Sequence, residues 1–84
     1  MKMRYIVRYE YFSDCMEILG DTKYTDPEFQ DKLALIEEYL YARYLEFLIL
    51  VKQDVEVARK ISRERAKQEC LGIEDRTRIK YDTI

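Results

Sequence analysis

The chain has 84 residues, enough for one domain whose folding removes only roughly 60 to 65% of the unfolded surface from water. Charged residues make up 38% of the chain, but the formal net charge is only −2, so no global field favours DNA or an anionic membrane. With two glycines and one proline, the composition is typical of helices. We therefore expect a single all-α domain over residues 1–84 that binds neither DNA nor a membrane.

The sequence offers little material for catalysis or for a cofactor. Histidine is absent, which removes the commonest general base and a common zinc ligand, and there is no glycine-rich phosphate loop or serine elbow. The two cysteines, Cys15 and Cys70, stand far apart, and no signal-like apolar segment at the N-terminus suggests export. We interpret both as buried free thiols of a cytoplasmic, non-enzymatic protein without metal or cofactor.

The first element can be interpreted in two ways. Apart from Ile6, apolar and charged residues alternate through the first eleven positions, which is typical of a strand. A helical face is also visible, made of Tyr5, Tyr9, Phe12, Met16 and Leu19. A lone pair of strands would be marginally stable, and Gly20 is a natural helix stop, so we favour a helix over about 5–19. An extended conformation for residues 1–12 remains the alternative.

A long second helix is predicted after Thr25-Asp26-Pro27, where a capping residue precedes a proline at the first helical position. From Phe29 onward, apolar residues recur at steps of three and four, without glycine or proline up to Leu71. Gly72 then predicts the end. We expect a helix over about 27–71, packed antiparallel to the first one, and an irregular or extended tail over 73–84.

Such a helix is too long for its own chain to cover. At 1.5 Å per residue it would extend about 66 Å, whereas a compact chain of this length has a radius of gyration near 12 Å. We expect the helix to bend at Lys52-Gln53-Asp54, where the run of apolar residues ends. Between Tyr39 and Val51 every position except Arg43 and Glu46 is apolar, which is too short and too charged for a membrane span. We therefore expect a homo-oligomeric bundle, with other copies covering this stretch.

Two clusters are candidates for binding an anionic ligand. A basic stripe follows the second half of the long helix: Lys52, Arg59, Arg63 and Lys67. An aromatic and basic cluster spans residues 4–12. Arginine grips phosphate bidentately and tyrosine stacks on bases. The simpler interpretations are a solvated face neutralised by nearby acids such as Glu56, Glu64 and Glu69, and ordinary packing of the aromatic residues.

The stretch Arg8-Tyr9-Glu10-Tyr11, followed by helices, resembles the phage anti-CBASS proteins, small helical oligomers that sequester cyclic oligonucleotide signals. The resemblance lies in the order of elements and in this short motif. It implies that Tyr11 stacks on a base, and that Lys23, Thr25 and either Arg59 or Arg63 hold the cyclic phosphate. The chain differs from that family in having no proline soon after Tyr11 and no evident hairpin turn in the long helix.

Two functions follow from these expectations. The first is a sponge that holds a cyclic di- or trinucleotide at subunit boundaries. Its candidate ligand-binding residues are Arg8, Tyr9, Tyr11, Lys23, Thr25, Arg59 and Arg63. The alternative is a protein-binding module or inhibitor, which would dock through a helix face rich in the eight tyrosines of the chain.

Overall fold

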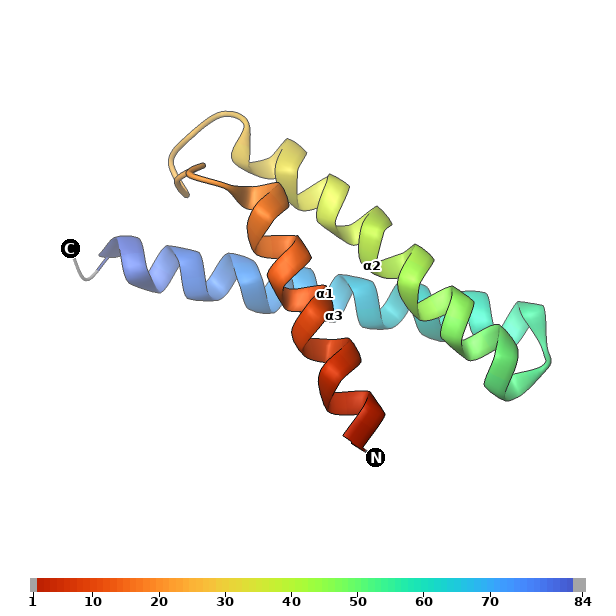
Figure 1. Cartoon of the computed structure of the whole chain (residues 1–84). Helices are drawn as coiled ribbons and strands as arrows, with labels where there is room; N and C mark the ends of the chain where they lie inside the picture. Colours follow the sequence, from red (N-terminus) through yellow and green to blue (C-terminus); the bar gives the residue numbers. More distant parts are fainter. Residues whose placement is uncertain (1, 83–84) are drawn as a thin grey trace.

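The computed structural model describes the backbone of residues 2–82 and the side chains of residues 11–51 and 53–80. It consists of three helices: α1 (Lys2–Leu19), α2 (Phe29–Lys52) and α3 (Val55–Asp82), as Figure 1 shows. Residues 2–82 contain no strand. The all-α class predicted from the composition is therefore confirmed.

Helix α1 occupies the N-terminal segment for which two interpretations competed. The backbone is already helical at Lys2, which agrees with the helical interpretation and not with the extended one. The helix ends at Leu19, and Gly20 follows with a φ of 57°. Glycine adopts this left-handed conformation without steric cost, and its N–H donates to the carbonyl of Met16 at 2.9 Å.

The long helix expected over 27–71 is wrong, because the chain forms two helices there. The break falls at the predicted bend, but it is a complete reversal and not a kink (Figure 1). Gln53 adopts a φ of 55°, and its N–H donates to the carbonyl of Ile49 at 3.0 Å. Asp54 then caps α3, since its carboxylate accepts the N–H of Val57 at 3.2 Å. The chain thus forms a hairpin turn at Gln53 and Asp54, although the sequence has no glycine or proline there.

The irregular tail expected over 73–84 is also wrong as far as residue 82, because α3 continues to Asp82. Gly72 lies inside the helix and does not end it. Its weak helix propensity costs about 1 kcal/mol. Ile73, the next residue, is only 3% exposed, and its burial in the core outweighs that cost. Residues 83 and 84 lie outside the described part of the chain.

The core is a hairpin in which α3 runs back beside α2. Helix α2 contributes large buried side chains, namely Phe29, Leu33, Ile36, Leu40, Tyr44 and Leu48. Helix α3 presents mostly small ones at four-residue steps, namely Ala58, Ser62, Ala66 and Cys70, followed by Ile73. Residues four apart share a helix face, so the small side chains of α3 form a shallow channel for the bulky ridge of α2.

Helix α1 packs on α2, away from the turn between α2 and α3, and this contact buries Cys15 and Leu19. Figure 1 shows that α1 crosses the hairpin at an angle and leaves the turn between α2 and α3 uncovered. The molecule is accordingly elongated, with extents of 45 × 26 × 17 Å. Its radius of gyration is 13.9 Å, larger than the roughly 12 Å of a compact chain of this length. No helix in the described residues is long and apolar enough to cross a membrane.

Candidate binding surfaces

Tyr11, the predicted base-stacking residue, lies in the contact between α1 and α2. Its ring meets the rings of Tyr39 and Tyr44 edge to face, with centroids 6.3 and 5.7 Å apart. Such aromatic pairs stabilise a core beyond their buried area. Tyr11 is half-buried by this packing, so a base that stacked on it would have to compete with two neighbouring rings.

The hydroxyl groups of those two neighbours are also engaged within the chain. The hydroxyl of Tyr39 donates to the carboxylate of Asp14 on α1, and that of Tyr44 donates to Glu69 on α3 at 2.6 Å. Burial, helped by the bond to Asp14, raises the pKa of Tyr39 to about 12. The cluster therefore ties all three helices together, which is a structural role.

Arg63, a predicted phosphate ligand, is held by two carboxylates of α2. Its Nη1 lies 2.8 Å from Glu37 and 2.9 Å from Glu38, and its guanidinium carbon lies 4.0 Å from the centre of the Tyr41 ring. The hydrogen bond to Glu38, more than any other contact, raises the pKa of Arg63. A phosphate would have to displace both acids, so Arg63 is poorly suited to hold an anion in the single chain.

The remaining candidates lie apart from Tyr11 and Arg63. Lys23 and Thr25 are exposed in the loop before α2, whereas Arg59 is exposed near the start of α3, close to the far end of the hairpin. The loop is ordered by Asp26, whose carboxylate accepts the N–H of Lys23 at 2.9 Å. The side chains of Arg8 and Tyr9 lie outside the described residues.

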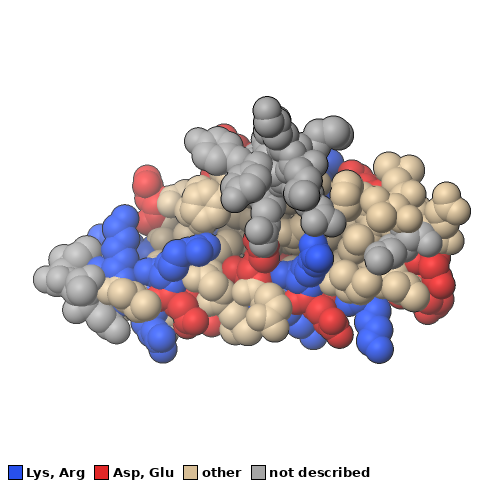
Figure 2. All heavy atoms as spheres, turned by 90° about the horizontal axis from the view of Figure 1, so that it is seen from below, with Lys and Arg blue, Asp and Glu red and all other residues tan. Residues whose placement is uncertain are grey.

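The described candidate residues are therefore not brought together within one chain. The distribution of charges on the visible face also shows no other basic site for an anion. In Figure 2, lysine and arginine side chains lie beside aspartate and glutamate side chains along the visible face, without a continuous basic region. The predicted basic stripe is divided between two helices, because Lys52 ends α2, and it is interrupted at Arg63 by two carboxylate partners. A multiply charged anion would meet acids at most positions on this face.

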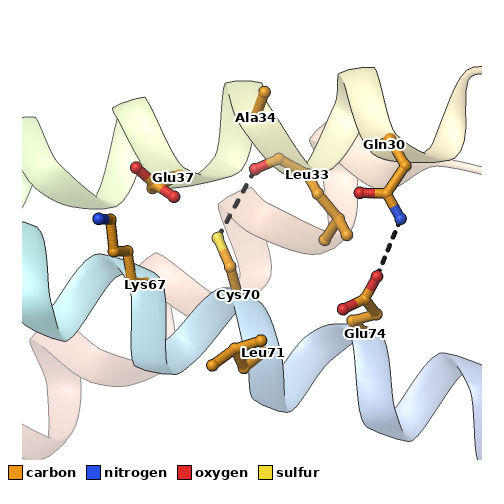
Figure 3. A pocket seen from close by; sticks show the side chains of 8 residues that line it. All are labelled: Gln30, Leu33, Ala34, Glu37, Lys67, Cys70, Leu71 and Glu74. Atoms are coloured by element: carbon orange, nitrogen blue, oxygen red, sulfur yellow. Dashed lines mark hydrogen bonds between the residues drawn. The ribbon is translucent and has the colours of Figure 1, made fainter.

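A shallow groove of about 370 Å³ separates α2 from α3 (Figure 3). One lysine and two glutamates line it, together with apolar residues, so it is also unsuited to an anion. Its lining is Gln30, Leu33, Ala34, Glu37, Lys67, Cys70, Leu71 and Glu74. Gln30 and Glu74 join across it at 2.9 Å. The described residues hold no cluster of three metal-binding side chains.

Both cysteines are free and buried, which confirms the prediction from their spacing. The thiol of Cys70 donates to the carbonyl of Leu33 at 3.6 Å. Burial raises the pKa of Cys15 to about 11 and that of Cys70 to about 12, with nearby carboxylates adding to the effect. At neutral pH both groups remain thiols, which are poor nucleophiles and poor metal ligands.

The most distinctive surface lies at the turn between α2 and α3, where large apolar side chains are exposed. We call it the hairpin-end patch. It consists of Phe47, Ile49, Leu50, Val51, Val55 and Val57. Leu50 is 78% exposed. In Figure 2, uncharged side chains gather at the corresponding end of the molecule. The sequence predicted that this stretch of α2 would be buried on all sides, whereas within one chain only the face towards the core is covered.

Comparisons of the chain with protein families, with curated proteins and with solved structures found no match. The resemblance to the anti-CBASS proteins consequently rests on the motif at residues 8–11 and on the order of elements. The cyclic-nucleotide function that it implies stays a prediction.

Proposed function

We propose that this protein is a non-enzymatic interaction module that docks its hairpin-end patch on a protein surface. The observation that carries the proposal is the clustering of six large apolar side chains on both sides of one turn. From their exposed fractions, the six residues present on the order of 500 Å² to water, which is at the upper end of the patches found on monomeric proteins.

The size of the patch is sufficient for binding. At about 25 cal/mol per Å², covering the patch would contribute on the order of 10 kcal/mol before the costs of association. Those costs are about 4 to 15 kcal/mol, so the patch alone supports weak to moderate affinity. This estimate favours a partner that adds contacts around the rim or that engages the module reversibly.

The docking surface that we propose is aliphatic, with one phenylalanine, and not rich in tyrosine. The described tyrosines are buried or half-buried in the chain, including Tyr24 and Tyr41, which lie away from the patch. The rings of Tyr11, Tyr39 and Tyr44 hold α1 on α2. The ring of Tyr24 packs on Phe29, and that of Tyr41 lies under Arg63. Phe47 and Leu50 replace them as the expected anchor residues.

A cyclic-nucleotide sponge assembled from several copies is the second proposal. It requires that another chain complete the pocket, because Tyr11 and Arg63 are engaged internally and Lys23 lies far from Arg59. Thermal melting with a panel of cyclic di- and trinucleotides separates the two proposals. We expect no shift, and a rise in melting temperature that grows with ligand concentration would reverse the ranking.

The docking proposal is tested by placing a photoreactive amino acid at position 50 in cells that express the protein. Leu35 is the matched control, since it is a leucine on the same helix, 57% exposed and outside the patch. We expect covalent adducts with protein from position 50 and few or none from position 35, identified by mass spectrometry. Equal labelling from both positions, or no adduct from position 50, would contradict the proposal.

A further inference from the structure

We infer that the partner of the hairpin-end patch is a second copy of this chain, bound through the same patch about a twofold axis. This inference rests on the proposed docking function and names its partner. Two hairpins would then meet end to end, and the turn of each would cover the turn of the other. A twofold contact requires a surface that complements itself.

The first argument is the position of the patch relative to the core. Val51 lies three residues after the buried Leu48 on α2, and Val55 lies three residues before the buried Ala58 on α3, so each shares a helix face with the core. The patch is therefore the exposed end of the same apolar layer that joins the two helices. A second copy presents the same aliphatic layer, so the two cores would become continuous across the interface.

The charges around the patch give the second argument, because they are mixed in sign. A rim of one sign would repel its own copy, whereas alternating charges can pair across a twofold axis. The flanking charged residues whose side chains the structure describes are Arg43, Glu46, Asp54, Glu56, Arg59 and Lys60. Among the described residues, Glu56, Arg59 and Lys60 have no ion-pair partner within the chain. An anionic membrane or a nucleic acid would instead favour a basic rim.

The third argument is the area. Two patches of on the order of 500 Å² would bury at most on the order of 1,000 Å² together, below the 1,200 Å² at which stable interfaces begin. Interfaces of this size are typical of weak or transient association, so we expect a reversible dimer. The dimer would be nearly twice as long as the 45 Å monomer, because the turn lies at one end of the long axis (Figure 1).

Sedimentation equilibrium of the purified protein over micromolar to millimolar concentrations tests the inference. We expect a monomer–dimer equilibrium that Leu50→Glu weakens at least tenfold and that the matched control Leu35→Glu leaves unchanged. Both leucines are exposed, so both variants are expected to fold, and their circular dichroism spectra are compared with that of the unmodified chain. X-ray scattering of the dimer should show an end-to-end particle.

Three results would overturn the inference: a monomer at all concentrations, equal weakening by the two substitutions, or a side-by-side dimer. A monomer that still gives adducts with a different protein from position 50 would refute the second copy and leave the docking function standing. Binding to anionic phosphatidylserine vesicles in place of self-association, lost in Leu50→Glu, would refute both proposals.

Discussion

Replacing Ser62 with alanine is expected to stabilise this protein. Ser62 is fully buried in the contact between α2 and α3, and its hydroxyl has no hydrogen-bond partner in the described part of the chain. It lies between Ala58 and Ala66 in the row of small residues on α3, so an alanine fits the same space. The substitution removes a polar group that lost its hydration on folding without gaining a partner.

The magnitude follows from two contributions. Burying an unsatisfied hydroxyl costs about 1 to 3 kcal/mol, and the substitution relieves that cost. Alanine also exceeds serine in helix propensity by about 0.5 kcal/mol. We therefore expect the free energy of unfolding to rise by about 1.5 to 3.5 kcal/mol. In a domain of this size, each 1 kcal/mol raises the melting temperature by about 4 to 8 °C.

Urea denaturation followed by circular dichroism measures the effect, and Ser13→Ala is the matched control. Ser13 lies exposed within α1, so its replacement gains helix propensity without changing a buried hydroxyl. The difference between the two variants isolates the cost of burying the hydroxyl. If Ser62→Ala were no more stable than Ser13→Ala, or were less stable than the unmodified chain, the hydroxyl would have a favourable partner and the reasoning would be refuted.

Three further predictions concern other features of the fold. Gln53→Gly should raise the free energy of unfolding by about 0.5 to 1 kcal/mol in urea denaturation, because glycine relieves the strain of a φ of 55° at the turn; a decrease would contradict this. Cys15 and Cys70 should react with a thiol reagent at pH 8 much more slowly in the native than in the denatured protein, and equal rates would show that they are accessible. Stability should fall as the pH rises from about 10 to about 12, because the unfolded chain loses the Tyr39 proton first; Tyr39→Phe should flatten this part of the pH profile.

Local signals predicted several elements correctly. The end of α1 follows from Gly20, and the break after Lys52 follows from the change in composition at Gln53. The size of the break was not predictable, because Gln53 is an ordinary helix residue and only the packing of α3 on α2 holds it in a left-handed conformation. The helix end predicted at Gly72 is wrong for the same reason. Its local preference is weaker than the burial of Ile73, which depends on residues far away in the sequence.

The ion pairs of Arg63 could not be predicted either, because they join residues that are far apart in the sequence. The sequence suggested nearby acids on its own helix, whereas the structure pairs Arg63 with Glu37 and Glu38 on α2. Those contacts exist only because the chain reverses at Gln53. In contrast, the excess of apolar residues between Tyr39 and Val51 is visible in the sequence. The structure adds that the exposed part of this stretch is the hairpin-end patch.

The uncovered end of the hairpin follows from the lengths and directions of the helices. At 1.5 Å per residue, the 18 residues of α1 extend about 27 Å and the 24 residues of α2 about 36 Å. Because α1 crosses the hairpin instead of running along it, lengthening α1 would not cover the turn (Figure 1). Nothing in the fold of one chain requires an apolar residue at Leu50, since a charged side chain would be solvated there at no cost. The docking surface that we propose would explain why the side chains at this end are apolar.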